Sequence, residues 1–107
     1  MKTQFAFVFP GQGSQSIGML DDLSKTFEAV KNRFDRASEV LDNDLWKIVA
    51  FGPVEQLNST ANTQPILLAS SMAIWDICLE LGCPMPSRLA GHSFGEYSAL
   101  VLSLIHI

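Results

Sequence analysis

The feature that most constrains the fold is a five-residue apolar run near the start of the chain, Phe5-Ala6-Phe7-Val8-Phe9, which Pro10-Gly11 ends. Aromatic and β-branched residues without polar alternation are typical of a strand buried on both faces, and proline followed by glycine stops such a strand in a turn. Strands of this kind occur in parallel sheets that helices cover. We therefore expect a strand over residues 5–9 inside a mostly parallel sheet.

Helical patterns follow the glycine-rich loop after this strand. Apolar residues recur at three- and four-residue steps between Thr26 and Leu41, which predicts one amphipathic helix over that range. The apolar clusters at residues 45–49 and 54–57 predict two short helical segments, separated by Gly52-Pro53. These helices would cover the sheet.

A longer helix is expected in the middle of the chain. Thr63 fits its N-cap, with Pro65 in the first turn, where a missing N–H costs nothing. The helix should run to about Leu81 and stop at Gly82. Its apolar residues surround most of the circumference, so we expect it to be buried.

A second strand over residues 88–90 and a helix over residues 96–102 complete the predicted order. Strands that alternate with helices predict an α/β fold. Two strands are too few for a stable sheet, and residues 99–107 end the chain in an apolar run without a cap. We therefore expect residues 1–107 to be the N-terminal portion of a domain that is truncated at its C-terminal end.

Composition narrows the functional classes. The chain has 107 residues, the size of one small domain, and its net charge of −4 includes no basic cluster. Nucleic acid and anionic membranes are therefore not expected partners. A bridge between Cys78 and Cys83 would close a very short loop, so free thiols are expected. The apolar run at residues 5–9 is shorter than a signal-peptide core, and no apolar stretch is long enough for a membrane span, so a cytoplasmic protein is expected.

The strongest chemical motif is Gly91-x-Ser93-x-Gly95, between the second predicted strand and the last predicted helix. This context is typical of a nucleophile elbow, in which Ser93 stands at a helix N-terminus and the backbone N–H of Phe94 contributes to an oxyanion hole. A serine N-cap in a tight turn is the alternative. His92 adjoins Ser93 in that turn, where side chains diverge, so we expect it to be structural and not the general base.

The glycine-rich loop after the first strand is a second candidate site. Gly11 and Gly13 stand in a segment of small and amide residues, but the spacing lacks the third glycine of dinucleotide-binding loops and the lysine of phosphate-binding loops. A plain connecting turn and a non-catalytic binding module therefore remain open for this loop. A serine hydrolase or thioesterase that uses the Ser93 elbow remains open as well.

Three motifs in combination resemble the malonyl-CoA:acyl carrier protein transacylase family. They are FVFPGQGSQ at residues 7–15, TQP at residues 63–65 and GHSFGE at residues 91–96, in the family's order and at similar separations. The resemblance implies that malonyl-CoA acylates Ser93 and that the phosphopantetheine thiol of an acyl carrier protein removes the acyl group. It also implies oxyanion donors at the backbone N–H groups of Gln12 and Phe94, and an acyl pocket lined by Gln64 and His92.

The resemblance has further implications for the whole enzyme. It implies an α/β-hydrolase-like subdomain, a discrete bacterial-type enzyme of fatty acid biosynthesis, and no tightly bound cofactor or metal. The family's general-base histidine and its carboxylate-binding arginine would lie beyond Ile107. We therefore expect the 107-residue chain to be inactive by itself.

Overall fold

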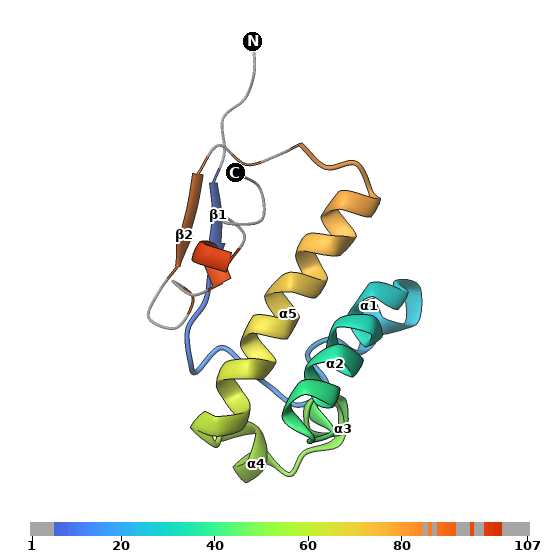
Figure 1. Cartoon of the computed structure of the whole chain (residues 1–107), viewed down its shortest axis with the longest axis vertical. Helices are drawn as coiled ribbons and strands as arrows, with labels where there is room; N and C mark the ends of the chain where they lie inside the picture. Colours follow the sequence, from blue (N-terminus) through green and yellow to red (C-terminus); the bar gives the residue numbers. More distant parts are fainter. Residues whose placement is uncertain (1–5, 85, 87, 92–94, 96–97, 102–107) are drawn as a thin grey trace.

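The structure is a computed structural model that describes residues 6–84, 86, 88–91, 95 and 98–101 (Figure 1). The described part is rich in helix and holds a small parallel sheet. Its elements in chain order are β1 (Ala6–Phe9), α1 (Asp21–Thr26), α2 (Glu28–Leu41), α3 (Leu45–Phe51), α4 (Val54–Asn58), α5 (Thr60–Glu80) and β2 (Arg88–Gly91).

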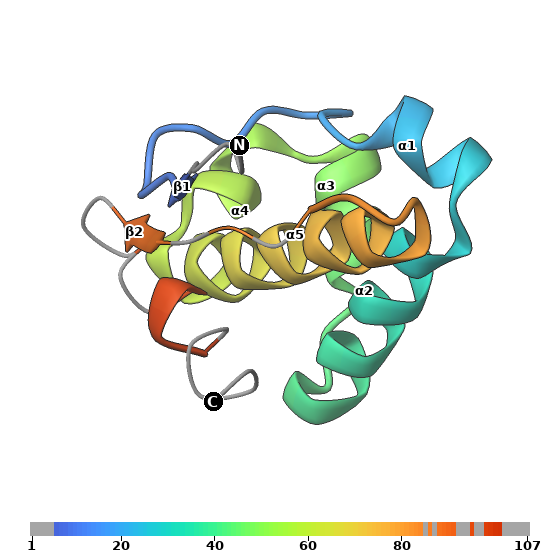
Figure 2. The same ribbon diagram turned by 90° about the horizontal axis from the view of Figure 1, so that it is seen from above.

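The long helix α5 is the central element. Figure 1 shows the two strands on one side of it and α1, α2 and α3 on the other, with α4 at its lower end; Figure 2 gives the view from above. The main apolar core lies between α5 and the other helices, where Val30, Phe34, Leu45 and Ile66 are completely buried. Each such side chain contributes roughly 1.5–3 kcal/mol by leaving water, so this cluster holds α5 in place. Within the described residues, no helix is both long and apolar enough to cross a membrane.

An ion pair adds a polar link between α2 and α5. The guanidinium of Arg33 donates to both carboxylate oxygens of Asp76, at 2.5 Å from Nε and 3.0 Å from Nη2. Hydrogen bonding to Asp76 raises the pKa of Arg33, against the opposing effect of burial. The two-pronged geometry gives this contact between α2 and α5 a defined direction.

The helix predicted from residue 26 to residue 41 is correct in its C-terminal part and wrong at its start. α2 begins at Glu28, because Phe27 is extended (φ −122°, ψ 120°) and separates α2 from the unpredicted helix α1. Phe27 packs against the core cluster, and this contact interrupts a pattern that reads as continuous in the sequence. The short helices predicted at residues 45–49 and 54–57 are confirmed as α3 and α4.

The predicted N-cap of the central helix is also wrong. Ser59 occupies the N-cap of α5, so Pro65 lies inside the helix and not in its first turn. Thr63 is fully buried, and its hydroxyl donates to the backbone carbonyls of Leu57 and Ser59 instead of accepting from a helix N–H. The predicted stop at Gly82 is confirmed, since α5 ends just before it.

The two strands pair in parallel, as expected for an α/β arrangement, but β1 is not buried on both faces. Phe9 is 6% exposed and Val8 71% exposed. Side chains alternate along a strand, and α5 covers the face of Phe7 and Phe9 only. On that face the ring of Phe7 meets the ring of Trp75 edge to face, with centroids 5.4 Å apart. No described element covers the face of Val8.

Candidate active site

The carboxyl ends of β1 and β2 lie side by side. The strands are parallel, and Phe9 at the end of β1 pairs with Gly91 at the end of β2. Each strand is followed at this edge by one of the two segments that the sequence singles out, the glycine-rich loop after β1 and the Gly91–Gly95 motif after β2. Ligand sites in parallel sheets are found at such edges.

Gly95 contacts the end of β1 directly. A Cβ atom on Gly95 would lie 2.0 Å from the carbonyl oxygen of Phe9, 2.7 Å from its carbonyl carbon and 2.9 Å from the oxygen of Pro10. These are backbone atoms that cannot rotate away, and all three separations are closer than real Cβ contacts. Glycine at this position therefore allows the backbone of the Gly91–Gly95 motif to touch the start of the glycine-rich loop.

The glycine-rich loop forms a closed turn. The backbone N–H and the hydroxyl of Ser14 both donate to the carbonyl of Gly11, at 3.4 Å and 2.9 Å. Gly13, the third residue of the turn, has φ +103°, and a positive φ at this place is typical of type II turns. Gln12 is thus the second residue of a defined turn. Among the hydrogen bonds of the described residues, none has the backbone N–H of Gln12 as its donor.

Two amide side chains join this turn to the corner between α4 and α5. The Nε2 atom of Gln12 donates to the hydroxyl of Thr60 at 3.3 Å, and Nε2 of Gln15 donates to Oδ1 of Asn58 at 2.8 Å. Thr60 and Gln64 are four residues apart on α5 and share a face of the helix. The half-buried Gln64 therefore lies one helical turn from the residue that Gln12 contacts.

The predicted residues Ser93, His92 and Phe94 lie outside the described residues, and so does the helix start at Glu96. Their roles remain predictions. Gly91 and Gly95, the described residues on either side of the predicted nucleophile, both lie at the sheet edge beside the turn of Gln12. Of the helix predicted after the motif, residues 98–101 are helical.

The sequence did not indicate the contacts that hold the loop. In the sequence, Gln15 is only the last residue of the motif at residues 7–15, and neither Asn58 nor Thr60 belongs to a motif. The side chains of Gln15 and Asn58 come from distant parts of the chain, and no periodic pattern marks such a pair. The available signal was the high amide content of the loop, since buried or half-buried amides usually find partners.

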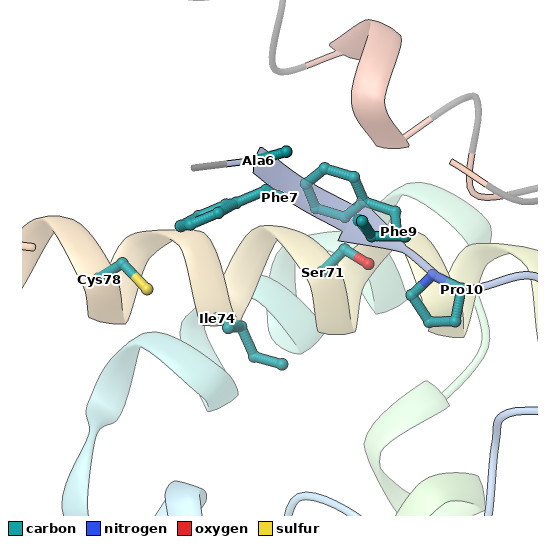
Figure 3. Close-up of a pocket in the computed structure, with 8 residues that line it drawn as sticks. Ala6, Phe7, Phe9, Pro10, Ser71, Ile74 and Cys78 are labelled. Carbon is teal, nitrogen blue, oxygen red and sulfur yellow. The ribbon is translucent and has the colours of Figure 1, made fainter. Parts of the chain in front are cut away.

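A separate pocket of about 370 Å³ runs along β1 (Figure 3). Its lining is mainly apolar, and residues 6–10 form one wall, with Ser71, Ile74 and Cys78 of α5 on the other. Burial in this setting raises the pKa of the Cys78 thiol, and the neighbouring Cys83 raises it further. A thiol with a raised pKa is a poor nucleophile at neutral pH. The thiol in this pocket is therefore not activated for nucleophilic attack.

Comparison with known proteins places the chain in a family. Residues 6–103 match a family model described as the acyl transferase domain. A malonyl CoA-acyl carrier protein transacylase from Salmonella typhimurium is 54% identical over 99 residues, which are 92% of this chain and 32% of that protein. The corresponding protein from Bacillus subtilis strain 168 is 46% identical, with 92% and 31% of the two chains covered. The chain thus spans about a third of the length of the curated relatives it matches.

Solved structures agree with this result. An acyl carrier protein S-malonyltransferase from Vibrio cholerae is 60% identical and superposes with a TM-score of 0.90, over 92% of this chain and 32% of that one. A malonyl-transacylase in complex with a type II PKS acyl carrier protein is 57% identical, with the same TM-score and coverage. The arrangement of the described elements is therefore shared with these structures.

Proposed function

We propose, since the chain belongs to the acyl transferase domain family, that the protein it is part of transfers a malonyl group from coenzyme A to the phosphopantetheine thiol of an acyl carrier protein. The observation that carries the proposal is the meeting of two motifs at one sheet edge, where Gly95 touches the backbone at the start of the turn of Gln12. The names of the curated relatives support the same reaction.

The domain assignment is part of the proposal. Residues 1–107 would be the N-terminal portion of an acyl transferase domain, built on an α/β-hydrolase-like subdomain. The coverage of about a third of each curated relative supports a partial domain. The family's general-base histidine and its carboxylate-binding arginine would then come from later parts of the domain.

The first half of the reaction forms an acyl-enzyme. The hydroxyl oxygen of Ser93 attacks the thioester carbonyl of malonyl-CoA, a base takes the hydroxyl proton, and the bond to sulfur breaks so that coenzyme A leaves as a thiol. The negative charge on the carbonyl oxygen would be held by the backbone N–H groups of Gln12 and Phe94. One oxyanion donor typically contributes about 10²–10³ to the rate.

The second half returns the enzyme to its starting state. The phosphopantetheine thiol of the carrier protein attacks the serine ester, the carbonyl–oxygen bond breaks, and the proton returns to Ser93. Gln64 and His92 would line the pocket that holds the malonyl group through both halves. The half-buried position of Gln64, one turn from the contact of Gln12 with Thr60, supports its place there.

Setting and cofactor requirement complete the proposal. We assign the enzyme to fatty acid biosynthesis in the cytoplasm, with malonyl-CoA and the carrier protein as substrates and without a tightly bound cofactor. The unpaired Cys78 and Cys83 are in keeping with a reducing compartment. Neither hydrolysis nor simple binding is favoured by the family match, because the curated relatives are transferases.

A two-step transfer experiment tests the reaction. The full-length protein is incubated with malonyl-CoA labelled in the malonyl group, freed from coenzyme A, and then given carrier protein with or without its phosphopantetheine arm. We expect a stable labelled enzyme that passes its label only to the carrier protein with the arm. Release of free malonate at the same rate without any acceptor would instead identify a hydrolase.

A further inference from the structure

The side chain of Gln15 makes two hydrogen bonds that connect the turn of Gln12 to the rest of the molecule. Its Oε1 atom accepts from the backbone N–H of Gly13 at 2.8 Å, and its Nε2 atom donates to Oδ1 of Asn58 at 2.8 Å. Both ends of one amide are therefore used. Asn58 is the last residue of α4, so the bond ties the turn to a helix end.

The place to which Gln15 connects is rigid. The hydroxyl of Thr63 is fully buried and bridges the backbone carbonyls of Leu57 and Ser59, on either side of Asn58. A corner with satisfied internal hydrogen bonds has little freedom to move, so it can serve as a fixed reference for the turn.

Within the turn, Gln15 bonds to the N–H of the peptide group that joins Gln12 to Gly13. Gly13 has φ +103°, a conformation that glycine shares with several alternatives of similar energy. The bond from its N–H to Gln15 selects one of these alternatives. The Gln12–Gly13 peptide is one rigid plane, so fixing the Gly13 N–H also fixes the carbonyl of Gln12. The Gln12 N–H lies in the preceding Gly11–Gln12 plane, whose carbonyl accepts from the backbone N–H and the hydroxyl of Ser14. Hydrogen bonds therefore hold the peptide planes on both sides of Gln12.

We propose that Gln15 is a positioning residue for acylation, which holds the Gly11–Ser14 turn so that the Gln12 backbone N–H meets the oxyanion. The inference rests on the proposed function, since it assigns a partner to one donor of that reaction. A displacement of about 1 Å in such a donor can cost about 10²-fold in rate. Loss of two hydrogen bonds near the surface is expected to disturb the fold much less.

The first test compares Gln15→Ala with Asn62→Ala in the full-length protein. Asn62 is an amide of the same corner that does not bond to the glycine-rich loop in the described structure. We expect Gln15→Ala to lower the rate of acylation by malonyl-CoA about 10- to 100-fold, with the KM changed less than about threefold. Asn62→Ala should keep the acylation rate within about twofold of the wild type.

The second test uses charge, and it distinguishes positioning from a loss of folding. In Gln15→Glu the carboxylate still accepts from Gly13, and Asn58 can turn its amide to donate to it. In Asn58→Asp the carboxylate still accepts from Gln15. The double variant places two acceptors of equal charge together with no proton between them. We expect each single variant to stay within about threefold of the wild-type acylation rate, and the double variant to fall at least tenfold.

The outcomes separate this inference from the proposed function. Wild-type protein that takes no malonyl label on Ser93 would remove the proposed function and this inference with it. Two results would overturn the positioning role and leave the proposed function in place. One is a labelled wild type with a Gln15→Ala variant that is acylated equally fast. The other is a double variant whose loss of acylation rate equals the product of the losses in its two single variants. If Gln15→Ala fails to unfold cooperatively, the charge series decides by itself.

Discussion

Replacement of Gly95 by alanine perturbs the contact on which the candidate site depends. The added Cβ atom would lie 2.0 Å from the carbonyl oxygen of Phe9, whereas an ordinary contact is 3.4 Å or more. The two backbone segments would therefore have to separate by about 1.4 Å. Because the turn of Gln12 begins two residues after Phe9, this separation would move the backbone N–H of Gln12, the proposed oxyanion donor, away from the Gly91–Gly95 motif.

The expected magnitude follows from this displacement. Forced overpacking typically costs about 1–3 kcal/mol in the free energy of unfolding. A misplacement of about 1 Å in a catalytic group costs about 10²-fold in rate. We therefore expect Gly95→Ala in the full-length protein to acylate about 10²-fold more slowly in a rapid-quench measurement with malonyl-CoA, and to unfold at lower urea concentration.

Gly82→Ala is the matched control. Gly82 has φ +72°, so alanine is strained there, but its Cβ atom would meet nothing within 4 Å. The position follows the C-terminal end of α5, whereas Gln64 lies near the start of that helix. This variant should lose about 1 kcal/mol of stability and keep its acylation rate. Wild-type acylation and wild-type stability in Gly95→Ala would refute the reasoning, as would an equal loss of acylation in the control.

Three further perturbations test separate parts of the account. Gln12→Ala should slow acylation less than Gly13→Val in a single-turnover measurement, because alanine keeps the backbone N–H whereas valine is strained at φ +103°; equal losses in two folded variants would contradict the backbone assignment. Asp76→Asn should lower the free energy of unfolding by about 1–2 kcal/mol in urea titrations, and Asp21→Asn, from an exposed ion pair, by less than about 0.5 kcal/mol. Burial raises the pKa of Cys78, so its alkylation by iodoacetamide should be slower in the folded than in the urea-unfolded protein near pH 8 and should accelerate as the pH rises; equal rates would show that the thiol is not buried.

Most of the elements and the burial of α5 could be predicted from local patterns, whereas α1 and the exposed face of β1 could not. The apolar run before Pro10 and the three- and four-residue steps of α2 are local signals, so β1 and α2 were found. The exposure of Val8 depends on whether another element covers the second face of β1. A run of five apolar residues carries no information about such an element. The break at Phe27 and the start of α5 before Thr63 depend on contacts with the core and with α4, which override local capping signals.

Some features of the candidate site are likewise marked by a local motif, and others depend on contacts between distant parts of the chain. Ser93, Gln12 and Gln64 could be proposed as site residues because their motifs are short and contiguous, and their roles stay predictions. The reason for glycine at position 95 is a backbone contact with Phe9, far away in the chain, and only the folded arrangement reveals it. The bond of Gln15 to Asn58 likewise joins segments that carry no shared pattern.

The central claim is that Ser93 carries the malonyl group, and peptide mass spectrometry of the full-length protein after reaction with malonyl-CoA tests it most directly. We expect a malonyl adduct on the peptide that contains Ser93 in the wild type, and no adduct in Ser93→Ala, because a serine ester is the predicted intermediate. An undiminished adduct in Ser93→Ala, or an adduct on Cys78 or Cys83 in its place, would contradict the claim.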